Sequence, residues 1–186
     1  KLAGAPLPQF MPYVGATATS LILIPGIAVG VNLLMTLRGH QAHIVASPSL
    51  RFTIAGIVGF LLLGFTGMAL NTPATLKMTQ FALTGYGFEV LAVCGFFSMC
   101  AFGGMYFIVP RITRREWLSR RFIGWHFWLT TYGILTVVVC SIMGGLFQGA
   151  AQEAYGNSWS DAASRSYAYN VGTTVAWGFI ALGSFF

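Results

Sequence analysis

Long apolar stretches separated by short polar ones are the feature that most constrains this chain. An α-helix needs about 20 predominantly apolar residues to cross the hydrocarbon layer of a membrane. The stretches therefore predict an all-α polytopic membrane protein, with a single transmembrane domain over residues 1–186. The expected spans are residues 14–37, 50–70, 78–109, 122–147 and 170–186.

The composition agrees with a protein built for lipid. It is 56% hydrophobic and only 8% charged, whereas a soluble domain carries about 25% charged residues. The net charge of +6 could indicate a nucleic-acid partner in a soluble protein. Here half of the basic residues lie between positions 111 and 121, so membrane topology explains the charge better, and lipid rather than nucleic acid is the expected partner. The three cysteines, Cys94, Cys100 and Cys140, lie in apolar runs and suggest neither a disulfide nor a metal site.

The distribution of basic residues predicts the orientation. Cytoplasmic loops are enriched in Lys and Arg. One side of the predicted bundle carries Lys1, Lys77 and Arg165. The other carries Arg38, Arg51, Arg111, Arg114, Arg115, Arg120 and Arg121. The N-terminus is therefore expected outside and the C-terminus inside, where inside means the cytoplasm if the inner membrane is bacterial and the matrix if it is mitochondrial.

Glu89 is the only carboxylate in any expected span, and it lies near the middle of the third. Ionisable residues inside membranes often have functional roles. Glu89, with Tyr86 and Thr84 nearby, could form a polar site that relays protons or contacts a ligand. Alternatively, Glu89 is protonated and hydrogen-bonded to a neighbouring helix, which is the favoured interpretation.

The histidines give weaker signals. His126 begins the motif HFWL in the fourth span, and a structural hydrogen bond among Trp125, Trp128 and Tyr132 is favoured over haem ligation. His40 and His43 have an i, i+3 spacing that could suit a metal ion. Two ligands alone are a weak indication, so both are expected at the surface. No catalytic or metal-binding residue is predicted.

Several motifs resemble one family in order and spacing. They are Pro110–Arg111, Arg115–Glu116, His126–Leu129, Gly145 and Gln148–Gly149, preceded by IPGIAVGVNLLMTLRG near the N-terminus. This pattern is similar to the C-terminal part of the catalytic subunit of C-family (cbb3-type) haem-copper oxidases. The resemblance implies a bundle whose last five of twelve helices match this chain.

One departure from the family concerns haem. The resemblance implies a His-x-His pair in the helix before the Val-Pro-Arg turn, one His for each haem. The corresponding positions are Phe88 and Val90, and neither side chain can ligate iron. The resemblance also places the copper ligands and the other low-spin haem ligand on helices that precede this region.

The leading hypothesis is a degenerate oxidase-like membrane subunit of a respiratory electron-transfer complex. It would act in packing and assembly, bind no cofactor alone, and contact other membrane subunits that could hold haem. A second hypothesis is the C-terminal part of a working cytochrome c oxidase subunit I, coupling oxygen reduction to proton pumping with metal ligands from other segments. A third is a proton- or quinol-interacting subunit using Glu89. The chain is expected to be a fragment of, or a partner to, a larger bundle.

Overall fold

The computed structural model describes residues 8, 10–39, 47–117, 119–154 and 158–185, apart from the side chain of Leu34. Within these residues all regular structure is helical, as predicted. The first helices are α1 (Met11–Leu37), α3 (Pro48–Leu70) and the short α4 (Pro73–Thr79). The remaining elements are α5 (Thr84–Val90), the π-helical segment η1 (Leu91–Ser98), α6 (Met99–Thr113), α7 (Arg120–Glu153) and α8 (Trp159–Gly183).

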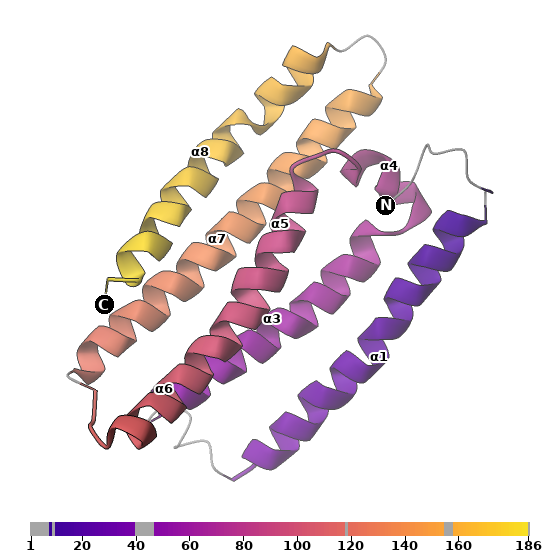
Figure 1. Ribbon diagram of the computed structural model, residues 1–186. Coiled ribbons are helices and arrows are strands. Elements are labelled where there is room, and N and C mark those ends of the chain that lie inside the picture. The colour runs from indigo at the N-terminus through magenta and orange to yellow at the C-terminus, as the bar shows by residue number, and fades with distance from the viewer. Residues whose placement is uncertain (1–7, 9, 40–46, 118, 155–157, 186) are drawn as a thin grey trace.

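The long helices lie side by side in one layer (Figure 1). Segments α5, η1 and α6 form one continuous helix, and the order across the layer is α8, α7, this continuous helix, α3 and α1. Neighbouring helices run antiparallel, so the beginning of α1 and the end of α8 lie at opposite ends of the layer (Figure 1). The end that contains the beginning of α7 is called the arginine end below.

Glycines allow the helices of the layer to approach closely. A Cβ added to Gly59 of α3 would lie 2.7 Å from the carbonyl carbon of Gly95 in η1. Likewise, a Cβ added to Gly145 of α7 would lie 2.8 Å from the Cα of Thr84 in α5. Close backbone contact of this kind replaces the hydrophobic driving force that helices lack in lipid.

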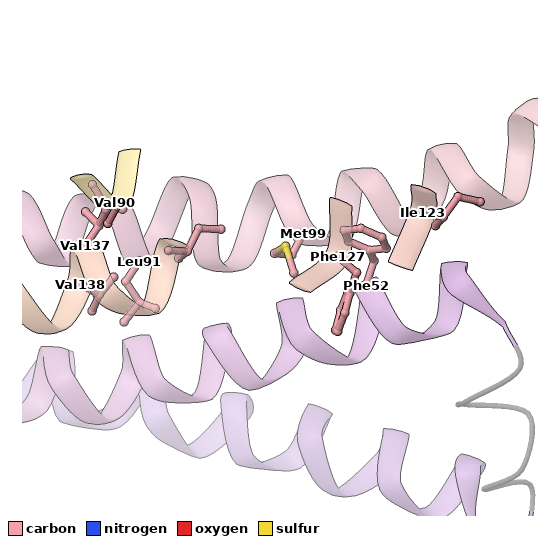
Figure 2. Packing of buried hydrophobic residues seen from close by; sticks show 10 residues of the cluster. Phe52, Val90, Leu91, Met99, Ile123, Phe127, Val137 and Val138 are labelled. Atoms are coloured by element: carbon pink, nitrogen blue, oxygen red, sulfur yellow. The ribbon is translucent and has the colours of Figure 1, made fainter. Parts of the chain in front are cut away.

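The buried apolar residues lie along the contacts of α3 and α7 with the central helix (Figure 2). Phe52 and Val137 are completely buried, and Met99 is 2% exposed. Most other large apolar side chains face outward, including Leu21, Phe97 and Leu135. Among the described residues, four helical stretches are long and apolar enough to cross a membrane: 11–37, 48–70, 84–113 and 120–153.

The third expected span, residues 78–109, is wrong at its beginning. Helix α4 ends at Thr79, and α5 begins only at Thr84. Between them Phe81 has a φ of 62°, a left-handed conformation that interrupts a right-handed helix. As a result Glu89 lies in the second turn of the 84–113 helix rather than near its middle.

The fifth expected span begins too late. Residues 159–169, expected in a loop, form the first turns of α8, and α7 continues to Glu153. Ser158 and Asp161 form a capping box that starts α8. Small side chains then fit the contact between α8 and its neighbours, since Ala162 is 1% and Ser166 4% exposed.

Candidate functional site

Glu89, Tyr86 and Thr84 all line one pocket of about 230 Å³. The pocket lies between the end of α3, α4 and the beginning of α5, at the end of the layer opposite the arginine end. Its wall also includes Asn71, Thr79 and Gln80. The structure thus brings the three predicted polar residues together and adds three further hydrogen-bonding side chains.

The three predicted residues have different surroundings. The Tyr86 hydroxyl accepts a hydrogen bond of 2.7 Å from the indole N–H of Trp177, which joins α5 to α8. Thr84 is 1% exposed and packs against Gly145 of α7. Its hydroxyl has no hydrogen-bond partner among the described residues.

Glu89 is exposed at the surface of the layer, on the wall of this pocket. An exposed carboxylate at this position can accept a hydrogen bond from a molecule that enters the pocket. The arrangement therefore suits a polar contact better than a buried structural one.

Phe88 and Val90 face two different apolar surroundings. The Phe88 ring lies 3.2 Å from the position of a Cβ on Gly67 of α3, with the methyl group of Thr19 in α1 also close to that position. Val90 is 6% exposed and belongs to the same cluster as Val137 and Val138 of α7 (Figure 2). Neither residue offers a donor atom, so these positions do not fit axial haem ligation.

His126 belongs to an aromatic cluster near the arginine end. The Tyr106 hydroxyl lies 2.7 Å from its Nδ1. The rings of Phe52 and Phe102 lie 5.1 and 4.8 Å from its ring. The side chain is 7% exposed, and its Nε2 has no hydrogen-bond partner among the described residues. Its neighbours are therefore Phe52, Phe102 and Tyr106. The residues expected from the sequence, Trp125, Trp128 and Tyr132, are exposed instead.

The predicted topology arginines gather at the arginine end. Arg111 donates a 2.9 Å hydrogen bond to the carbonyl of Phe107 and stacks over its ring at 3.4 Å. Arg114 ends α6 in a left-handed conformation, with φ 52°. The exposed members of this group are Arg111, Arg114, Arg115, Arg120 and Arg121.

Gln148 is a structurally important residue that the sequence analysis assigned only to a motif. Its side-chain oxygen accepts a hydrogen bond of 3.2 Å from the backbone N–H of Leu83. That N–H precedes α5 and has no intrahelical partner in this helix, so it needs an acceptor from elsewhere. The signal that could have revealed this role was a glutamine among glycines in GGLFQG.

Within the described part of the chain, no three His, Cys, Asp or Glu side chains gather in a way that could hold a metal ion. His40 and His43 lie outside the described residues.

Comparison with known proteins gives a match over residues 2–184 to the family model described as "Cytochrome C and Quinol oxidase polypeptide I". A cytochrome c oxidase subunit 1 homolog from Azorhizobium caulinodans is 25% identical over 150 residues, which cover 80% of this chain and 27% of the relative. Cytochrome c oxidase subunit 1 from Rhodobacter capsulatus is 26% identical over 144 residues, which cover 77% of this chain and 27% of the relative. The cbb3-type cytochrome c oxidase subunit CcoN1 from Stutzerimonas stutzeri is 25% identical over 144 residues, which cover 77% of this chain and 30% of the relative. The chain therefore spans less than a third of the length of these relatives.

Proposed function

Because the chain belongs to the cytochrome c and quinol oxidase polypeptide I family, we propose that it is a packing subunit of a respiratory oxidase complex and holds no redox centre itself. It is an integral membrane protein with several apolar helices. Its partners are other membrane subunits of that complex, which carry any haem. The curated relatives are bacterial, which supports a bacterial inner membrane with the arginine end inside.

The observation that carries this proposal is the packing of Phe88 and Val90. The resemblance to the cbb3-type subunit places axial haem ligands at these two positions. In this chain the Phe88 ring contacts the α3 backbone at Gly67, and Val90 is buried in the α7 contact. Both side chains contribute to helix packing and supply no electron pair to iron. The apolar surroundings also favour this role over that of the C-terminal part of a working oxidase subunit.

The haem content of the purified chain tests this proposal. The chain is expressed in a bacterial host that synthesises haem and purified in mild detergent. The pyridine haemochrome assay and the visible spectrum then measure haem per chain. We expect far less than one haem per chain, in both the native sequence and a His126→Phe variant. A stoichiometric His-ligated haem spectrum in the native sequence would refute the proposal.

A second experiment separates a packing role from a role in catalysis within a complex. Phe88→Ala is expected to reduce the amount of assembled complex, because it removes a ring from the contact of the central helix with α3. The complex that still assembles should keep its haem content and its oxygen-reduction rate per haem. A loss of haem or of rate per assembled complex would indicate a working oxidase subunit instead.

The Glu89 pocket supports a second candidate function, that of a proton- or quinol-interacting subunit. A carboxylate, a phenol and two amide side chains line this single pocket. Photo-crosslinking with an azido-quinone in membranes tests it. Labelling within residues 70–89 that disappears in Glu89→Gln would support this function, and labelling that is unchanged would contradict it.

A further inference from the structure

A second polar pocket, of about 300 Å³, lies at the arginine end. It is bounded by the beginning of α3, the end of α6 and the beginning of α7. The side chains that matter for its chemistry are Ser47, Tyr106, Arg111, Glu116, Trp117 and Arg120. None of these residues lines the Glu89 pocket, and among them Tyr106 also takes part in helix packing through Phe52 and His126.

The position of this pocket corresponds to the headgroup layer of a membrane. The continuous helix 84–113 has 30 residues, so it is about 45 Å long at 1.5 Å per residue. The hydrocarbon layer is only about 30 Å thick. The helix is thus longer than the hydrocarbon layer, and the basic residues at and after the end of α6 favour a position of this end in the polar layer. Trp117, whose ring contacts the Tyr106 ring at 5.1 Å, is of the residue type enriched there.

The pocket is positively charged. Arg111 and Arg120 line it against the single carboxylate of Glu116. Among the described residues neither arginine forms an ion pair with Glu116. Arg111 uses one N–H to bond the carbonyl of Phe107, and its guanidinium has four further N–H donors. The stacking on the Phe107 ring and this bond hold the guanidinium in place for a ligand.

Two helix beginnings add to the positive potential. Helices α3 and α7 both begin beside the pocket, at Pro48 and Arg120. The serines that precede them, Ser47 and Ser119, make no side-chain capping bond. Uncapped first-turn N–H groups and the helix dipole both favour an anion at such a place.

We propose that this pocket binds the phosphate-bearing headgroup of an anionic phospholipid. The fork of an arginine matches phosphate oxygens in two-point hydrogen bonds, and basic pockets between helices on the cytoplasmic side suit such headgroups. A lipid is favoured over free phosphate because the pocket adjoins apolar surface. Phe107 in its wall is 50% exposed, and Ile108 and Ile112 on the same helix are 51% and 76% exposed. These side chains offer contact to an acyl chain.

Native mass spectrometry of the full chain from nanodiscs tests the proposal. The nanodiscs contain phosphatidylcholine with a minor fraction of phosphatidylglycerol, and the measurement is the ratio of the two lipids that remain bound. A charge-assisted hydrogen bond to an ionised group contributes about tenfold or more in affinity. We therefore expect Arg111→Gln with Arg120→Gln to lower the phosphatidylglycerol preference by at least about tenfold.

The matched control is Arg114→Gln with Arg115→Gln, which removes the same charge from the same end of the layer but from residues that do not line the pocket. This control should lower the preference by a clearly smaller factor, because it loses only the screened attraction of the removed charges and no direct hydrogen bond. An equal loss in both double variants would overturn the proposal, since it would reflect only the charge of the loop.

Two further measurements guard against misfolding and identify the ligand. Glu116→Gln removes the opposing carboxylate and keeps both arginines, so it should raise the phosphatidylglycerol preference. An unchanged or lower preference would count against the pocket. Inorganic phosphate at millimolar concentration should leave the bound lipid in place. Displacement of the lipid by phosphate would show a free-phosphate site and overturn the lipid assignment.

Discussion

Gln148 near the end of α7 accepts a hydrogen bond from the backbone N–H of Leu83, 65 residues earlier in the chain. Leu83 is the residue that precedes α5. On the same face of α7, Gly145 meets Thr84 and Gly149 meets Met78. Backbone contacts thus lie three residues before Gln148 and one residue after it. Together these three α7 residues fix where the central helix begins.

Gln148→Met should lower the free energy of unfolding by about 1–3 kcal/mol, because it leaves a partly buried backbone N–H without its acceptor. Methionine keeps the length of the side chain. The measurement is unfolding in mixed micelles of dodecyl maltoside and sodium dodecyl sulfate. The control is Ser98→Ala, whose exposed hydroxyl bonds only the carbonyl of Val93 in the same stretch of helix. Equal stabilities for Gln148→Met and the native chain would contradict this assignment.

Gly149→Ala should destabilise the chain by about 1–3 kcal/mol, the usual cost of overpacking. An added Cβ would lie 3.0 Å from the Cα of Met78, with the carbonyl of that residue closer still. Backbone atoms cannot move aside as a flexible side chain can. Gly124→Ala in the same helix is the matched control, since nothing lies within 4 Å of the added atom. It should be neutral or stabilise by up to about 1 kcal/mol through helix propensity, and a similar loss in both variants would exclude the contact as the cause.

Tyr106→Phe should lower the free energy of unfolding by about 0.5–1.5 kcal/mol, because it removes the hydrogen bond to Nδ1 of His126 and keeps the ring. The bond connects α6 to α7 beside the fully buried Phe52, whose ring lies 5.1 Å from the Tyr106 ring. Nitrogen-15 NMR of labelled histidine provides a direct readout. The chemical shift of His126 Nδ1 should change in Tyr106→Phe and remain unchanged in Tyr132→Phe, which alters an exposed ring of α7. An unchanged His126 signal in both would show that the hydrogen bond is absent.

The sequence was sufficient to predict the long apolar helices and the arginine end, because hydrophobic length and charge are properties of local segments. It failed around Phe81, where the chain adopts a positive φ that no proline or glycine announces. It also failed to place the beginning of α8. The first turns of α8 have the polar composition of a loop, although the Ser-x-x-Asp pattern at Ser158 is a known start signal for a helix. The pocket partners of Glu89 and the acceptor role of Gln148 depend on contacts between distant segments, which a single sequence does not contain.

The beginning of α8 should become less stable in acid. The Ser158 hydroxyl donates a 2.6 Å hydrogen bond to the Asp161 carboxylate, and the Ser158 backbone N–H donates another of 3.1 Å. These bonds, with a smaller contribution from Arg165, hold the pKa of Asp161 below its ordinary value. A carboxyl with a lowered folded-state pKa stabilises the fold above its unfolded pKa of about 4, and this contribution is lost as the pH falls through the folded pKa.

Hydrogen exchange of the first turn of α8 should therefore gain protection from pH 3 to pH 6, after correction for the intrinsic exchange rate. In Asp161→Asn this gain should disappear, whereas Glu153→Gln should retain it. A gain that persists in Asp161→Asn would show that another group controls the beginning of this helix.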